Sequence, residues 1–460
     1  MATITLGPII GKVTHDSARI LIETASKATV TLKAVGADHS GEPLSHTLKA
    51  KTVQPYTLTG LRPDTLYTLE IDGANCPVQG SFKTLPQNPE RLNFGFLSCN
   101  KPWSLNDDPT DQWAYLFDSH VNTRKIDILL HLGDQVYADR TFKKAMRYLA
   151  NRPAARRDTP PNATESNMIL SMYRDEYRDN WTEPGTRQVL ANVSNLMIWD
   201  DHEVRDGWGG KPQDHDPNHP AFHIGTLARQ VYREYQRQLW ADDDPTVPSS
   251  TYEDHMHVFG TIGVLMTDQR GGRQLDDSSP YLGAAQWRRI EQALSPGGLF
   301  ANTTALVVAT PVPLVYYNTT QIKKLRKYSD NVEDHWSWPP HAAEQLRMLK
   351  CLAKWKAADS RRILQVIGGD VHLASNTSVM RNGKEIFRQT VASPITNLPN
   401  IAPLYGVIKS NLKKSAKIAG KFTCKHENLV AVRNYGVLNV KAPTQGSASF
   451  KSRLVFPERA

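Results

Sequence analysis

The chain has no apolar run long enough to cross a membrane and very little cysteine. No stretch approaches the roughly 18 apolar residues of a membrane span, and the first ten residues lack a basic segment followed by a long apolar core. The few cysteines lie far apart, without the close pairs of a zinc ribbon or the density of a disulfide framework: Cys76, Cys99, Cys351 and Cys424. These absences predict a soluble protein of a reducing, cytoplasmic compartment, or a secreted or periplasmic one if a leader has been removed.

The chain has many charged residues, with a small excess of basic over acidic ones. Of the 460 residues, 40% are hydrophobic and 22% are charged, which is enough for two or three domains with substantial cores. Lysine and arginine outnumber the acids by 55 to 46, and the net charge of +9 would attract an anionic substrate over long range. Solubility alone explains such a charge as well, so it does not decide the function.

The pattern of the sequence changes near residue 86. Before it, β-rich runs alternate with turns, which indicates a small antiparallel sandwich over residues 1–87, with strands at 18–23, 28–34, 65–71 and 80–84. Residues 61–67 resemble the tyrosine-corner turn of fibronectin type III domains, so we expect Tyr67 to be structural.

After residue 86, strands alternate with helical stretches, which is typical of a layered α/β domain. Strands are expected at 92–97, 126–132, 193–199, 258–267, 305–310 and 363–367, and helices at 227–240, 284–294 and 342–358. Residues 140–167 are polar, basic and proline-containing, which predicts a mobile insertion beside the site. Residues 409–425 hold six lysines at helix-like spacing and predict a solvated surface helix, or alternatively one that touches anions or membrane.

Four segments rich in oxygen, sulfur and imidazole groups follow apolar strands. Because open α/β sheets place their chemistry at strand ends, these segments predict one shared site: Ser98-Cys99-Asn100, residues 133–137, residues 199–203 and residues 368–372. Asp134 has two oxygens and can bridge two cations. Residues 200–203 pack three acids and one imidazole together, for which a metal is the simplest compensation, the alternative being a helix cap with Glu203 in salt bridges.

Together with Asp268-Gln269-Arg270, these segments occur in the order found in the alkaline phosphatase D (PhoD) family of metallophosphatases. The chain resembles that family over residues 91–440, and residues 441–460 are expected to be a C-terminal tail. The resemblance implies a metallophosphatase-type four-layer sandwich, in which two central mixed β-sheets are flanked by helices, behind a fibronectin type III-like sandwich. It also implies a hydrolase of phosphomonoesters, phosphodiesters or both, which uses a metal-activated hydroxide in a binuclear centre.

The resemblance assigns metal ligands position by position. A first ion would be held by Cys99, Asp134, Tyr137 and His372, and this thiolate, phenolate and imidazole set suits ferric iron. A second ion would be held by Asp134, Asp201 and Asp370. The related purple acid phosphatases supply a histidine after an intermediate strand, where residues 307–311 contain none. An all-oxygen second site favours calcium, with magnesium, manganese or zinc as other choices.

Roles toward the substrate follow from charge. His202 would donate a proton to the leaving alkoxide or contact the phosphate, unless it is a structural partner of Glu203. Arg270 would bind a phosphate oxygen, unless it pairs with Asp268. A substrate role is weighed against loop packing for Asn100 and His335. Two other functions stay open, namely hydrolysis of nucleotide or lipid pyrophosphates and binding without catalysis. No specific nucleic-acid binding is expected, and the sequence does not predict the oligomeric state.

Overall fold

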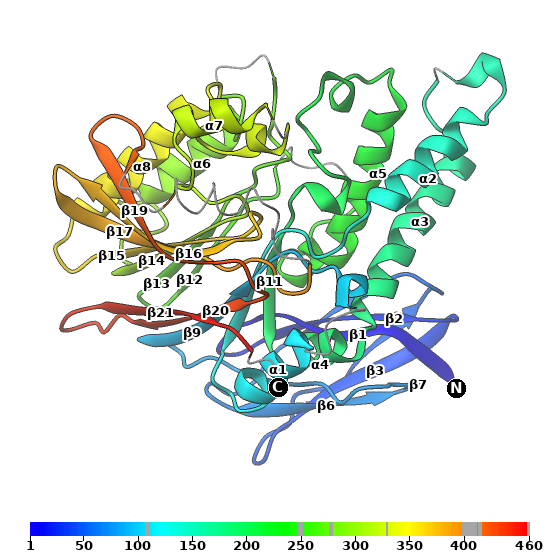
Figure 1. Ribbon diagram of the computed structural model, residues 1–460. Coiled ribbons are helices and arrows are strands. Elements are labelled where there is room, and N and C mark those ends of the chain that lie inside the picture. Colours follow the sequence, from blue (N-terminus) through cyan, green and yellow to red (C-terminus); the bar gives the residue numbers. More distant parts are fainter. Residues whose placement is uncertain are drawn as a thin grey trace.

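The computed structural model describes residues 1–105, 111–157, 159–246, 252–275, 279–327, 330–397, 412 and 416–457. An all-β region at the N-terminal end lies beneath a larger part in which sheets and helices are layered (Figure 1). The all-β region has two four-stranded sheets, of order β5-β2-β1-β7 and β4-β3-β6-β8. Their strands are β1 (Ala2–Val13), β2 (Ala18–Thr24), β3 (Ala28–Val35), β4 (Leu44–Leu48), β5 (Gln54–Leu58), β6 (Leu66–Asp72), β7 (Ala74–Asn75) and β8 (Ser81–Lys83).

Alternating apolar residues form the core of this N-terminal sandwich. Along β3 the side chains of Val30, Leu32 and Ala34 are buried while their neighbours are partly exposed, as expected of a strand with one face on a core. The hydroxyl of Tyr67 accepts a hydrogen bond from the Arg62 amide at 2.9 Å. Tyr67 therefore has the structural role that its turn motif predicts.

Two mixed sheets share a core in the larger part. The five-stranded sheet has the order β11-β10-β9-β20-β21, with β9, β10 and β11 parallel. The eight-stranded sheet has the order β12-β13-β14-β15-β17-β16-β19-β18, with β13, β14, β15 and β17 parallel. The bounds are β9 (Arg91–Leu97), β10 (Ile128–Leu132), β11 (Ser194–Ile198), β12 (His255–Phe259), β13 (Ile262–Met266), β14 (Ala305–Thr310), β15 (Ile363–Gly368), β16 (Ala374–Arg381), β17 (Lys384–Val391), β18 (Ala416–Lys417), β19 (Phe422–Val430), β20 (Tyr435–Lys441) and β21 (Ser449–Val455).

Helices cover the outer faces of both sheets, which confirms the four-layer arrangement. Trp113 and Val189, from α1 and α4, pack against the five-stranded sheet, and Trp287 and Leu352, from α6 and α8, pack against the eight-stranded sheet. A separate group of α2, α3 and α5 stands to one side (Figure 1). None of the described helices is long and apolar enough to cross a membrane. The helices are α1 (Gln112–Leu116), α2 (Asp139–Ala150), α3 (Ala163–Trp181), α4 (Pro184–Leu190), α5 (Pro220–Tyr235), α6 (Ala284–Leu294), α7 (Thr319–Leu325) and α8 (Ala342–Ala357).

The expected mobile insertion at residues 140–167 is wrong over most of its length. It contains α2, one face of which buries Phe142, Ala145 and Leu149 while its basic residues face solvent. It also contains the start of α3, where Asn162 and Glu165 form a capping box. The polar composition that suggested mobility belongs to the exposed face of an amphipathic helix.

One strand prediction and one helix prediction also differ from the structure. Residues 258–267 are not one strand but the hairpin of β12 and β13, which turns at Gly260 with φ of 56°. The expected helix at 227–240 begins earlier, because Pro220 occupies its first turn, and it ends at Tyr235.

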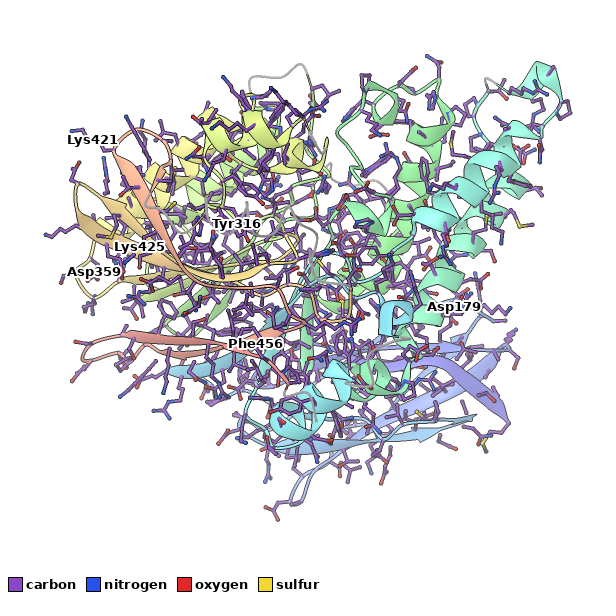
Figure 2. The ribbon with its side chains drawn as sticks, in the orientation of Figure 1. Asp179, Tyr316, Asp359, Lys421, Lys425 and Phe456 are labelled. Atoms are coloured by element: carbon purple, nitrogen blue, oxygen red, sulfur yellow. The ribbon has the colours of Figure 1, made fainter. Side chains whose placement is uncertain are left out.

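The lysine-rich segment is a hairpin where the structure describes it, and much of residues 409–415 lies outside the described residues. Residues 416–425 belong to β18, a turn and β19, where Phe422 and Cys424 are buried and Lys421 and Lys425 are exposed. This alternation has the period of a strand, not of a helix. Figure 2 shows Lys421 at the margin of the molecule. Residues 449–455, expected in a C-terminal tail, form β21 and pair with β20 along its whole length.

The N-terminal sandwich is joined to the helical group by a buried acid. The carboxylate of Glu23, on β2, accepts hydrogen bonds from the Tyr235 hydroxyl at 2.7 Å and from Arg178 Nε at 2.8 Å. The hydroxyl of Thr5 donates a third hydrogen bond at 2.6 Å. Glu23 is fully buried, so these donors stabilise its charge in place of water, and the carboxylate ties the sandwich to α3 and α5.

Replacing Glu23 with alanine should therefore destabilise the whole protein. Arg178 would keep a buried charge with one partner fewer, and we expect the free energy of unfolding, measured by urea titration, to fall by about 3 kcal/mol. Glu70→Ala, on the exposed side of β6, is the matched control and should change it by about 0.5 kcal/mol or less. Equal effects of the two substitutions would show that the Glu23 contacts do not hold the two parts together.

Candidate metal centre

The polar segments that follow the parallel strands meet where the ends of the two sheets approach each other. Gly133 has φ of 87°, and a Cβ there would lie 2.4 Å from the Asp200 Cβ. A Cβ on Gly369 would lie 2.6 Å from the Ser98 side chain, which belongs to the other sheet. Only glycine permits both approaches, so these two positions bring all four segments into one site.

Four residues of this site have a backbone conformation that side chains with a Cβ rarely adopt. The φ angles are 61° at Cys99, 56° at Asp134, 59° at Asp370 and 50° at His372. Each such residue costs of order 1–3 kcal/mol and persists only where the surrounding structure enforces it. All four are predicted metal ligands, and strain of this kind gathers at functional sites.

A thiol and a phenol contact one oxygen of Asp134, and an imidazole contacts the phenol. Cys99 Sγ lies 3.3 Å and the Tyr137 hydroxyl 3.4 Å from Asp134 Oδ2, and the same hydroxyl lies 3.3 Å from His372 Nε2. Burial raises the pKa of both Cys99 and Tyr137 well above their usual values, and nearby carboxylates add to the effect. Burial lowers the pKa of His372 to about 3, helped by the charges of His202 and Lys101. The imidazole is therefore neutral, as a metal ligand must be.

Carboxylates surround the remaining side of Asp134. Oxygen atoms of Asp134, Asp200 and Asp370 lie within 4.8 Å of one another, and so do ligand atoms of Asp134, Asp201 and His202. Asp134 Oδ1 and Asp200 Oδ2 are buried without a hydrogen-bond partner. Burial raises the pKa of Asp134 and Asp370 well above the usual range, and the neighbouring acids contribute to both shifts. Unpartnered carboxylate oxygens and mutual repulsion are what bound cations would relieve, so the donor set fits a pair of metal ions.

Asp200 is a member of this cluster that the sequence analysis did not select. Of two adjacent aspartates, only Asp201 was assigned as a ligand, yet Asp201 Oδ2 accepts the Gly207 amide at 2.6 Å. Burial raises the pKa of Asp200 to about 7 against the opposing charge of Arg270. Both neighbouring carboxylates have an oxygen near Asp134. The local turn brings both there, and sequence spacing carried no signal for Asp200.

Arg270 lies inside the site but its guanidinium is already bound by protein groups. It contacts Asp200 through Nε, the Trp208 carbonyl at 3.1 Å through Nη1, and Asp334 at 3.1 Å through the same nitrogen. Nη2 lies 3.4 Å from Asp201. The side chain is 1% exposed. Its expected alternative partner, Asp268, accepts a hydrogen bond from the Arg270 backbone amide at 2.9 Å and forms no ion pair with the guanidinium among the described contacts. The geometry favours Arg270 as an internal counter-charge to the acids, and contact with phosphate stays a prediction.

His202 is oriented by an acid that we did not single out. Its Nδ1 lies 2.8 Å from Asp139 Oδ2, and its ring packs on Tyr137 with centroids 4.1 Å apart. Burial opposes the charged imidazole, but Asp201, Asp134 and Asp139 together raise the pKa of His202 well above its usual value. A protonated imidazole with one nitrogen fixed is suited to proton donation. The expected alternative partner, Glu203, forms other contacts.

Asn100 and His335 lie at the margins of the centre. Asn100 is fully buried, and its Oδ1 accepts hydrogen bonds from Trp113 Nε1 and Thr396 Oγ1, each at 3.0 Å, so it anchors a loop. His335 stacks with Tyr316 and keeps Nδ1 without a partner. Burial lowers the pKa of His335 to about 4, so the ring is neutral. Substrate contact by either residue stays a prediction.

Glu203 connects two of the ligand-bearing loops. Its carboxylate accepts hydrogen bonds from the backbone amides of Asp134 at 3.1 Å, Gln135 at 2.7 Å and Asp200 at 2.8 Å. Gln236 Nε2 donates a fourth hydrogen bond, at 3.0 Å. The expected salt bridges of Glu203 are replaced by these neutral donors. Glu203 is thus a positioning residue that holds the loop after β10 against the loop after β11.

Comparison with known proteins agrees with this architecture. Residues 94–446 match the model of the PhoD-like phosphatases, and residues 1–88 match a domain of unknown function, DUF7800. A solved structure of PhoD has a TM-score of 0.69 at 17% identity and covers 99% of this chain and 90% of that one, which shows a shared fold.

Two curated relatives match over a smaller part of the chain. Alkaline phosphatase D of Bacillus subtilis is 24% identical over 182 residues, which are 38% of this chain and 28% of that protein. An uncharacterised protein of Saccharomyces cerevisiae is 23% identical over 375 residues, 66% of this chain and 53% of that protein. The chain thus spans about half or less of these relatives. Because the family model covers more than half of the chain, the protein belongs to the PhoD-like phosphatase family.

Proposed function

We propose that the protein is a metal-dependent phosphoric-ester hydrolase that acts on phosphomonoesters, phosphodiesters or both. The observation that carries the proposal is Asp134, whose carboxylate joins a sulfur, phenol and imidazole group to a group of buried acids. Family membership and the alkaline phosphatase D relative support the same reaction class.

The two groups of ligands differ in chemistry and suit different ions. Cys99, Tyr137 and His372, with Asp134, would hold ferric iron, because sulfur, phenolate and imidazole favour a transition metal. Asp134, Asp370 and either Asp200 or Asp201 offer only oxygen, which suits calcium. When bound, such a pair of ions lowers the pKa of water and neutralises charge on phosphoryl oxygens. These four acids and three softer ligands supply both sites: Cys99, Asp134, Tyr137, Asp200, Asp201, Asp370 and His372.

The protein's own groups would orient the substrate and supply a proton. His202 Nε2 is the atom from which a proton would pass to the leaving alkoxide, because Nδ1 is held by Asp139. Arg270 would keep Asp200 and Asp201 ionised and correctly directed. Glu203 would hold the loop after β10 against the loop after β11.

Replacing Asp134 with asparagine should remove both metal binding and activity. The amide presents one oxygen and no charge, so we expect the variant to be purified without iron or calcium and to lose hydrolysis of an aryl phosphate, its bis-aryl diester and a nucleotide. Asp118→Asn, an exposed acid in the π-helical turn after α1, is the control and should retain both properties. Full activity of Asp134→Asn without bound metal would contradict the proposed function, and activity of the wild type on pyrophosphate bonds alone would indicate a different hydrolase.

Replacing His202 with glutamine should lower kcat by about 100-fold or more, the usual contribution of a general acid. The loss should be smallest for esters with good leaving groups, such as nitrophenol, because they need no proton. Asp139→Asn should reduce kcat in the same direction but less, since the imidazole remains. The measurement is kcat for a series of aryl and alkyl phosphates. An equal loss for all leaving groups would contradict proton donation by His202.

Replacing Glu203 with alanine should loosen the loops without removing a ligand. Three backbone amides would lose their acceptor, and by analogy with other supports of metal ligands we expect metal affinity to fall about 10–100-fold. Glu203→Gln retains an acceptor oxygen and should fall between the alanine variant and the wild type. Competition with a chelator measures the affinity. Unchanged metal affinity in Glu203→Ala would show that the loops are held by other contacts.

A further inference from the structure

Most of the positively charged side chains described around the centre already bind acceptor groups of the protein. Arg270 is bound to three acids and a carbonyl, and Arg273 is bound to Asp334 at 2.6 Å and to the Glu333 carbonyl at 3.2 Å. One nitrogen of His202 is held by Asp139. Neither arginine offers the free fork that usually binds phosphate.

Lys101 is different, because its ammonium group has no hydrogen-bond or ion-pair partner among the described residues. It follows Asn100 on the loop after β9, and its Nζ lies 5.2 Å from the centroid of the Tyr137 ring. The side chain is half-buried. Lys101 therefore lies beside the predicted iron ligands and not on a remote surface.

Hydrogen bonds hold the backbone at Lys101 in place. The Lys101 amide donates to Thr396 Oγ1 at 2.5 Å, and the Asn100 amide donates to the Asp134 carbonyl at 2.8 Å. The same Thr396 hydroxyl donates to Asn100 Oδ1. Only the flexible stem of Lys101 is left to adjust, so its ammonium can follow a ligand without moving the metal ligands.

The ammonium group of Lys101 has no anion beside it among the described residues, so an incoming anion can pair with it without displacing a protein acceptor. We propose that Lys101 binds a non-bridging oxygen of the phosphoryl group and favours dianionic phosphomonoesters over monoanionic phosphodiesters. This inference rests on the proposed function, because it requires a phosphate ester in the same centre. The preference follows from charge, since the attraction to one ammonium group is larger for a dianion than for a monoanion at the same distance.

Lys101→Gln tests the inference through binding as well as catalysis. Loss of one charge-assisted hydrogen bond should raise the inhibition constant of inorganic phosphate about tenfold. It should also lower kcat/KM more for an aryl phosphate than for its bis-aryl diester. Lys101→Arg keeps the charge and should recover part of both effects. Lys143→Gln, on the exposed face of α2, is the control and should change neither.

The outcomes separate this inference from the function on which it rests. Iron and calcium contents of Lys101→Gln should equal those of the wild type, because no ligand is altered. If the wild type hydrolyses both esters and Lys101→Gln leaves phosphate inhibition and the ratio of the two kcat/KM values unchanged, the role of Lys101 is wrong and the proposed function stands. If the wild type hydrolyses neither ester and does not bind phosphate, both are wrong.

Discussion

The carboxylate of Asp134 is buried beside other acids at the meeting point of two sheets, and most of the site depends on how this negative charge is compensated. Asp134, Asp200 and Asp201 are each at most 4% exposed. Water cannot solvate them, so each ionised oxygen needs a donor, a positive side chain or a bound cation. The protein supplies part of this compensation and leaves Asp134 Oδ1 and Asp200 Oδ2 without it. Those two atoms are where the proposed cations would bind.

The protein compensates the buried negative charge near the site in two ways. Arg270 and Arg273 provide permanent positive charge, which keeps the pKa of Asp334 well below its usual value despite burial. Glu203 is stabilised instead by backbone amides, which carry no net charge. The first arrangement fixes the direction of side chains, and the second fixes the position of loops. A metal centre assembled from several strand ends needs both, because no single loop carries a complete ligand set.

The sequence predicted the strand ends well, because apolar strands followed by glycine and acids have a strong pattern, as at Gly133 and Asp134. The prediction was wrong for α2. The charged residues of this helix lie on its exposed face, and apolar residues between them are buried. The prediction was also wrong for the lysines near Lys421, which alternate along a hairpin. Within the site, the sequence could not reveal that Arg270 is enclosed by acids, because those contacts join loops from two different sheets. Pairings of this kind depend on how the sheets pack and have no local signal.

The contact between Glu23 and Tyr235 has a further consequence. Tyr235 and Gln236 are consecutive, and Gln236 donates to Glu203, so buried hydrogen bonds joined by one stretch of backbone connect the N-terminal sandwich to the amide of Asp134. The sandwich contributes none of the proposed ligands, yet it is packed into the support of their loops. Exchanging it for an unrelated β-domain would remove the buried acid to which Tyr235 and Arg178 donate.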